Sequence, residues 1–171
     1  MPNRLIAILS ATVLSGALSG IFFTDDSFLA GLGIFYGPGV FFGVITGALF
    51  ILVYQTYFLK ALLWAGASTL SWYLALRLYT FLSDGDAGVV NMILAGVAGA
   101  ILLSSFYWLL IRKISWKRIF LTIASGGLGA AIMYAVLQGE DAETTLRYVI
   151  SFVVWQTGVG LALTFDSEKN K

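Results

Sequence analysis

Six apolar stretches, each close to the length of a bilayer crossing, constrain this chain more than any other feature. A helix rises about 1.5 Å per residue, so roughly 20 apolar residues cross a hydrocarbon core about 30 Å thick. Backbone amides and carbonyls must be paired in hydrocarbon, which favours helices. The stretches cover approximately residues 5–23, 35–54, 61–79, 89–111, 119–138 and 148–165 of the 171. We therefore expect an all-α, polytopic transmembrane helix bundle, with residues 1–171 forming a single integral membrane domain in the lipid bilayer.

The composition supports this and limits the chemistry. Hydrophobic residues make up 59% of the chain and charged residues 11%, with a mean hydropathy of +0.90; soluble domains have about 25% charged residues. The chain has no Cys and no His, which excludes thiol nucleophiles and His-based metal sites or general bases. We expect a protein that is not an enzyme and that has no cofactor, no metal site and no nucleic-acid partner.

The distribution of charge predicts the orientation. With the N-terminus in the cytoplasm, eight of the ten basic residues lie on the inner side, and the Arg112–Arg118 cluster falls in a short inner loop. The positive-inside rule is strongest for such loops. We therefore expect six spans with both the N- and C-termini cytoplasmic, in a plasma (inner) membrane.

The second span needs an interruption, because residues 28–58 are uncharged and too long for one untilted crossing. Gly37-Pro38-Gly39 is a natural break, since Pro lacks an amide donor. We expect Phe28 to Tyr36 to form a separate outer segment, re-entrant or interfacial, with Pro38 in the first turn of the span. A kinked, continuous helix is the alternative.

The first span has an alternative interpretation as a signal peptide. Arg4 precedes an apolar stretch, and Ser15-Gly16-Ala17 resembles a small-residue cleavage site. The apolar run continues to Phe23, which favours a retained helix. Cleavage would leave five spans and an outer N-terminus.

Small residues recur every four positions along several spans, which places them on one helix face. Such rows let two helix backbones approach closely. We expect them to pack helices within the bundle, or to contact a partner subunit. The rows are Gly16 with Gly20; Gly39, Gly43 and Gly47; Gly127 with Ala131; and Gly158 with Ala162.

Aromatic residues near the expected inner surface are predicted to form an interfacial belt, because amphipathic rings prefer that depth. They are Tyr54, Tyr57, Phe58, Trp64, Tyr107, Trp108 and Trp116.

Acidic residues cluster in the expected outer loops: Asp25 and Asp26, Asp84 and Asp86, and Glu140, Asp141 and Glu143. Oxygen-rich clusters bind divalent cations or act as acid and base in some proteins. None of these matches a specific calcium-loop pattern. We expect solvated charges that help to set the orientation, with an outer-surface enzyme as a minor alternative.

Uncharged polar and aromatic residues in the outer halves of the last three spans predict a ligand pocket. Small neighbours leave space there, and polar tips provide directional hydrogen bonds. The candidate ligand-binding residues are Asn91, Tyr134, Gln138, Tyr148, Ser151, Trp155 and Gln156. Gln156 is central in its span, so its amide must bond to another helix or to a ligand. The alternative is that these groups only pin helices together.

The chain resembles the substrate-binding S components of energy-coupling-factor vitamin transporters. The similarity rests on the six spans, on Ala7-x-x-x-Ala11 in the first span, on the apolar segment before a Gly-Pro-rich second span, and on the polar outer ends of spans four to six. It implies that Ala7 and Ala11 face a coupling subunit. It also implies that the first outer loop and the last three spans enclose a vitamin.

These observations favour a non-catalytic membrane protein that binds or transports a small, largely uncharged solute through an outer-facing pocket. The alternative is a structural or assembly subunit that docks into a larger membrane protein complex through its small-residue rows and its basic inner loop.

Overall fold

The computed structural model describes residues 2–23, 28–83, 88–138 and 144–164, and every regular element in these ranges is a helix. This confirms the all-α prediction for the described part of the chain. The helices are α1 (Pro2–Phe23), α2 (Phe28–Tyr54), α3 (Phe58–Leu82), α4 (Val89–Leu110), α5 (Trp116–Leu137) and α6 (Thr144–Thr164). All nine Asp and Glu residues lie outside the described ranges, so the predicted acidic clusters do too.

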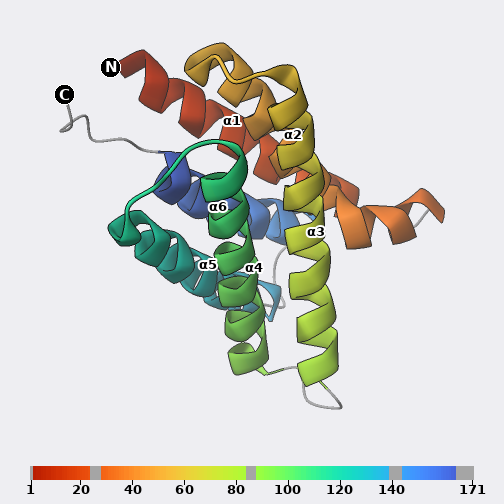
Figure 1. Ribbon diagram of the computed structural model, residues 1–171. Coiled ribbons are helices and arrows are strands. Elements are labelled where there is room, and N and C mark those ends of the chain that lie inside the picture. Colours follow the sequence, from red (N-terminus) through yellow and green to blue (C-terminus); the bar gives the residue numbers. More distant parts are fainter. Residues whose placement is uncertain (1, 24–27, 84–87, 139–143, 165–171) are drawn as a thin grey trace.

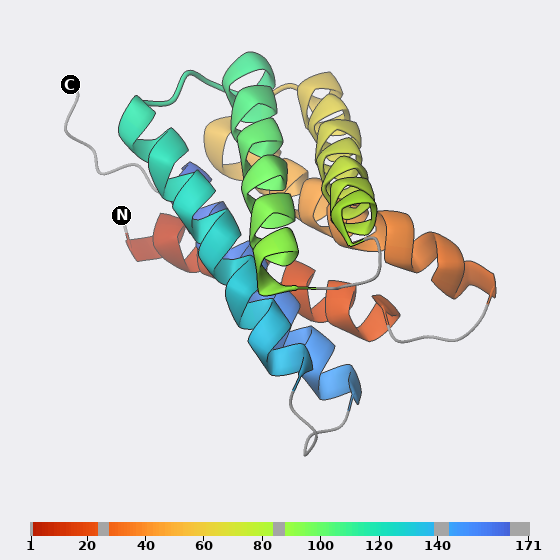
Figure 2. The same cartoon turned by 90° about the horizontal axis from the view of Figure 1, so that it is seen from below.

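The six helices form a closed ring (Figures 1 and 2). Each helix packs against the next one in the chain, and α6 packs against α1 to close the ring. In Figure 1, α3 and α4 run side by side, while α1, α5 and α6 cross them obliquely. Because successive helices are antiparallel, the helix ends form two groups, and α1 begins on the same side as α6 ends.

Five of the described helices, α1, α2, α4, α5 and α6, contain segments long and apolar enough to cross a bilayer. The chain therefore has the makeup of a multi-pass membrane protein. Helix α3 is long enough, but Lys60, Arg77 and several Ser, Thr and Trp residues reduce its hydropathy, and it is not among the five. The sixth crossing stays a prediction.

Helix α2 differs from the prediction for residues 28–36. It is continuous from Phe28 to Tyr54, with Pro38 inside it, so the prediction of a separate segment ending at Tyr36 is wrong as to secondary structure. The alternative of a continuous helix is the one found. Proline lacks the amide N–H, so inside a helix it leaves the carbonyl four residues earlier without its usual donor, and apolar helices of this kind tolerate such a position. Pro38 is buried, and the Gln156 amide of α6 donates to its carbonyl at 3.3 Å, which ties α6 to α2 at this point.

Glycines set the close helix contacts. A Cβ atom on Gly16 or Gly20 would lie about 2.5 Å from the backbone of α6, at Val153 and Val149. The same holds at the α4–α5 crossing, where Gly96 and Gly126 meet backbone to backbone. No side chain larger than hydrogen fits at these four glycines without a shift of the backbone, so they allow the close approach of α1 to α6 and of α4 to α5.

Buried aromatic side chains fill the ring near the ends of α2 and α4. Phe50, Trp64 and Tyr107 are fully buried, and the Trp64 and Tyr107 rings meet edge to face with centroids 5.8 Å apart. The indole N–H of Trp64 donates to Thr46 Oγ1 at 2.8 Å. Trp64 and Tyr107 are therefore core residues, and their assignment to an interfacial belt is wrong. Trp108 and Trp116, which are 47% and 76% exposed, have the exposure that a belt requires.

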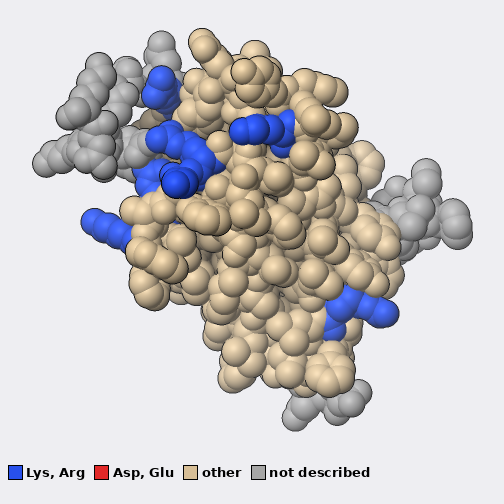
Figure 3. Space-filling view, in the orientation of Figure 1, with Lys and Arg blue, Asp and Glu red and all other residues tan. Residues whose placement is uncertain are grey.

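Basic residues mark one end of the molecule, which we call the basic end. It carries Arg4, Lys60, Arg112, Lys113, Lys117 and Arg118, at the starts of α1, α3 and α5 and in the α4–α5 connection. In Figure 3 most of the visible Lys and Arg atoms gather over the region where α1 and α5 begin and α6 ends. There, Tyr54 and Arg118 donate to the last-turn carbonyls of Thr164 and Leu163 in α6, where donors and positive charge stabilise a helix C-terminus.

Candidate binding pocket

A pocket of about 240 Å³ lies at the end of the bundle opposite the basic end. Among the residues whose side chains the structure describes, those that line it come from α1, α3, α4, α5 and α6. The last residue of α1, the C-terminal parts of α3 and α5, the N-terminal part of α4 and the N-terminal and central parts of α6 converge around it. The lining residues are Phe23; Trp72, Ala75, Leu76 and Tyr79; Met92, Ala95 and Gly96; Ala130, Met133 and Leu137; and Tyr148 and Trp155.

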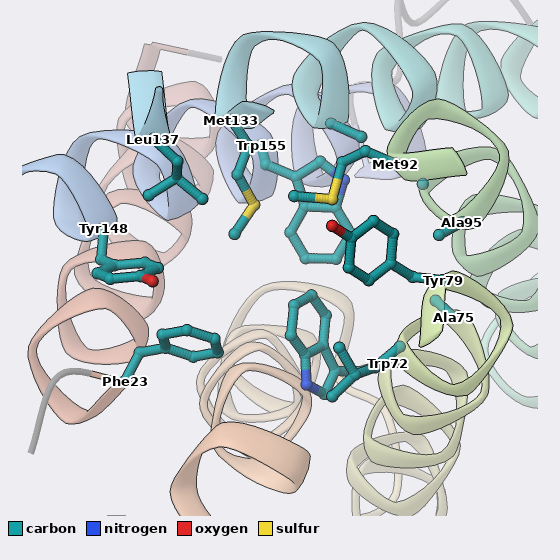
Figure 4. A pocket seen from close by; sticks show the side chains of 13 residues that line it. Phe23, Trp72, Ala75, Tyr79, Met92, Ala95, Met133, Leu137, Tyr148 and Trp155 are labelled. Carbon is teal, nitrogen blue, oxygen red and sulfur yellow. The ribbon is translucent and has the colours of Figure 1, made fainter. Parts of the chain in front are cut away.

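Aromatic rings in contact with one another build one side of the pocket (Figure 4). The Phe23 and Tyr148 rings lie 4.7 Å apart between centroids, and the Trp72 and Trp155 rings lie 5.5 Å apart. Phe152, which is fully buried, contacts both Phe23 and Trp72 and joins the two pairs. Tilted ring pairs at these distances are mutually attractive, so this wall is held in place before any ligand enters.

The other lining residues are mostly small or flexible. Ala75, Ala95 and Ala130 leave the space, and the Met92 and Met133 thioethers border it (Figure 4). Methionine adapts its shape to irregular partners and contacts aromatic rings favourably. The combination of a stiff aromatic wall and adaptable sulfur side chains suits a flat, apolar ligand.

The polar groups of the pocket are few and uncharged. Among the described lining residues none is acidic or basic, and Tyr79 and Tyr148 carry the hydroxyl groups. In Figure 4 both hydroxyl oxygens lie on the pocket side of their rings. A charged ligand would have no counter-charge among these residues, whereas a neutral ligand would meet apolar surface and the two tyrosine hydroxyl groups.

Two of the seven predicted ligand residues, Tyr148 and Trp155, line this pocket. They come from one face of α6, as their spacing of seven residues indicates. Ser151 lies between them on the same helix and is fully buried, and its hydroxyl oxygen has no hydrogen-bond partner among the described residues. It does not line the pocket.

Three other predicted residues lie elsewhere. The Asn91 side chain donates to the Leu82 carbonyl at 3.0 Å, which ties the start of α4 to the end of α3. Tyr134 is half-buried, and Gln138 is exposed at the C-terminus of α5. Neither is part of the pocket lining, because the face of α5 that turns inward carries Ala130, Met133 and Leu137.

Gln156 is fully buried and bonds to other helices. Its side-chain oxygen accepts a hydrogen bond from the Ser15 hydroxyl, and its amide donates to Ser19 Oγ at 2.8 Å and to the Pro38 carbonyl. Both ends of the amide are therefore used within the bundle. The depth of Gln156 predicts that its amide bonds either to another helix or to a ligand. In the structure it bonds to other helices and joins α6 to α1 and α2.

The small-residue row on α2 lies within the bundle. Cβ atoms on Gly39 and Gly43 would meet the α3 backbone at Thr69 and Ala65 at 2.6 Å, and one on Gly47 would meet the Ala61 carbonyl at 3.1 Å. The row therefore packs α2 against α3. Ala7 and Ala11 on α1 are only half-buried.

Most of the lining is apolar, whereas the residues predicted for the site are mainly polar. Trp72 and Tyr79 of α3 are seven residues apart, a spacing that places them on one helix face, and this signal was present in the sequence. Phe23 carries no such signal in the sequence, because it is simply the last residue of an apolar span.

Comparison of the chain with protein-family models, with curated proteins and with solved structures found no significant match.

Proposed function

We propose that this chain is a non-catalytic multi-pass membrane protein that binds a small, largely uncharged solute in the aromatic pocket. The observation that carries the proposal is the convergence of five helices on an uncharged space of about 240 Å³ with an aromatic wall. The volume is below the range of roughly 300–1,000 Å³ typical of ligand sites, which favours a compact ligand. A planar, neutral molecule with one or two hydrogen-bonding groups fits the lining best.

The pocket lies at the end that the charge distribution assigns to the outside. We therefore propose that α3 also crosses the membrane, that both termini are cytoplasmic, and that the protein lies in the plasma membrane. The resemblance to S components of vitamin transporters supports an outer site built from the last three spans. It makes neutral heteroaromatic vitamins the first ligands to test.

Ligand binding is tested on the full-length protein in detergent or nanodiscs. Indole and a panel of neutral heteroaromatic vitamins are screened by thermal shift, and positive ligands are titrated by Trp fluorescence, because two Trp rings border the site. We expect saturable binding by at least one compound. A panel without any thermal shift or fluorescence change contradicts the proposal.

Variants of the pocket residues test whether the ligand binds in this pocket. Trp155→Ala removes part of the aromatic wall and should weaken binding by about thirtyfold, the usual effect of deleting a central aromatic contact. Ala95→Leu keeps the wall and fills the space, so it should abolish binding without unfolding the protein. Trp108→Ala and Gln138→Ala, at exposed positions outside the lining, are the matched controls and should bind as the wild type does. Equal losses in the controls would place the binding elsewhere.

A role as an assembly subunit is the second candidate. The Gly39, Gly43 and Gly47 row is occupied by α3, so a partner would have to use another surface. Ala7 and Ala11 are the predicted contact residues that remain partly exposed. Co-purification of a stoichiometric partner, lost in Ala7→Leu/Ala11→Leu and retained in Gly66→Leu, would favour this function.

A further inference from the structure

A second hollow lies at the basic end, between α1 and α5, and is independent of the aromatic pocket. Helix α6 packs against both α1 and α5, while α1 and α5 make no contact with each other in the described part of the chain. This leaves a groove of about 720 Å³ with α6 as its floor. Its residues are Leu5; Ser115, Lys117, Arg118, Leu121 and Ser125; and Gly158, Leu161 and Ala162.

Small residues on α6 make the groove deep. Gly158 and Ala162 are one turn apart on the floor, so no long side chain fills the space between the walls. A Cβ atom on Gly158 would have the Ser125 Cβ at 3.6 Å as its nearest neighbour, an ordinary contact distance. Gly158 is therefore not required for close helix packing as Gly16 and Gly126 are.

The groove changes from polar to apolar along its length. On α5 the basic pair Lys117 and Arg118 and the Ser115 hydroxyl stand at the basic end, with Leu121 one turn further in. On the facing helices Leu5 and Leu161 add apolar surface. Helices α1, α5 and α6 are all among the five that are long and apolar enough to cross a bilayer. In a bilayer, a groove between them that starts at the basic end would open toward lipid where headgroups give way to acyl chains.

We infer that this groove binds an anionic phospholipid, with its phosphate at Lys117 and Arg118 and an acyl chain along Leu5, Leu121 and Leu161. Charge complementarity selects the anionic headgroup, because basic pockets between transmembrane helices recognise lipid phosphates. The N-terminus of α5 also favours a bound anion at this end of the groove. Ser115 makes no side-chain capping bond there, and the positive end of the helix dipole favours an anion. Arg118 also donates to the Leu163 carbonyl, so one of the two basic residues of the proposed lipid site is hydrogen-bonded to the last turn of α6.

The test uses the full-length protein in mixed micelles that contain phosphatidylglycerol or phosphatidylcholine. Bound lipid is counted by native mass spectrometry and the apparent affinity is obtained by titration. We expect one retained phosphatidylglycerol and no comparable retention of phosphatidylcholine. Lys117→Gln/Arg118→Gln should weaken phosphatidylglycerol binding by about thirtyfold, since each basic residue near an anionic surface contributes roughly fivefold. The charge-matched control Lys60→Gln/Lys113→Gln removes two charges from the same end but none from the groove, and should bind as the wild type does.

Further variants test the shape of the groove and the identity of its occupant. Ala162→Phe fills the floor and should abolish retention, whereas Gly66→Phe, which enters open space on α3, should not. Arg118→Lys preserves the charge and should keep most of the binding. The inference is overturned if the charge-matched control loses as much binding as the groove variant, or if phosphatidylcholine is retained equally. Displacement of the lipid by millimolar inorganic phosphate would also overturn it. A large gain in lipid affinity on Asp166→Asn/Glu168→Gln would mean that these carboxylates of the C-terminal segment compete for the groove, and would overturn the inference.

Discussion

Trp72 of α3 and Trp155 of α6 bring their rings to 5.5 Å, with the planes at 59°, across the interior of the helix ring. The two helices make no backbone contact in the described part of the chain, so the side chains alone bridge the gap. Both indoles border the aromatic pocket. The contact that spans the ring is thus also a wall of the proposed binding site.

The Trp72–Trp155 contact should be energetically coupled. Tilted aromatic pairs contribute about 0.5–1.5 kcal/mol beyond burial, so the double variant Trp72→Leu/Trp155→Leu should be less destabilised than the sum of the single variants by that amount. The free energy of unfolding in detergent is measured for the wild type, the two single variants and the double variant, which together form a double-mutant cycle. Strict additivity would mean that the rings do not stabilise each other.

Gln156→Leu tests the polar contact between α1, α2 and α6. Loss of the amide leaves Ser19 and the Pro38 carbonyl without this partner, which should lower the free energy of unfolding by about 1–3 kcal/mol. Ligand affinity should stay within twofold, because Gln156 does not line the pocket. Gln138→Leu at the exposed end of α5 is the control. Loss of ligand binding with unchanged stability would show that Gln156 belongs to the binding site.

Gly16→Ala and Gly66→Ala should have opposite effects. The added methyl at Gly16 would lie 2.5 Å from Val153 Cα, which forces α1 away from α6, whereas Gly66 has open space around it. Overpacking of this kind costs about 1–3 kcal/mol, while Gly→Ala in an open helix position stabilises by up to about 1 kcal/mol. Thermal unfolding of the two variants measures both. Similar melting temperatures would contradict the close α1–α6 packing.

Thr46→Val should remove the acceptor of the Trp64 indole, whose N–H is then buried without a partner. The variant keeps the shape of the side chain, so the expected loss of about 1–3 kcal/mol reports the hydrogen bond. Thr80→Val, at an exposed hydroxyl that donates to the Arg77 carbonyl in its own helix, should change stability by less than about 0.5 kcal/mol. Equal effects in the two variants would place Trp64 outside the core.

Accessibility of introduced cysteines decides whether α3 crosses the membrane. The chain has no Cys, so Tyr57→Cys, Gly88→Cys and Ser115→Cys each provide a single thiol. A six-span topology predicts that Tyr57→Cys and Ser115→Cys react with an impermeant reagent only from the cytoplasmic side, and Gly88→Cys only from the outside. Labelling of Tyr57→Cys and Gly88→Cys from the same side would show that α3 does not span.

The number and kind of the helices follow from the sequence alone, because hydrocarbon-length apolar runs must pair their backbone amides internally. The start of α2 does not, since the helix begins at Phe28 and continues through Pro38. The sequence also placed Tyr148 and Trp155 on one face of α6, since that relation depends only on local helix geometry. Which helix faces pack against one another is apparent only in the tertiary structure. The inward face of α5 carries Ala130, Met133 and Leu137 rather than Tyr134 and Gln138, and Trp64 lies in the core although its position suggested the interface. These outcomes depend on the rotation of each helix about its axis. That rotation is fixed by glycine contacts such as Gly16 with Val153, between residues far apart in the chain, which no single stretch of sequence encodes.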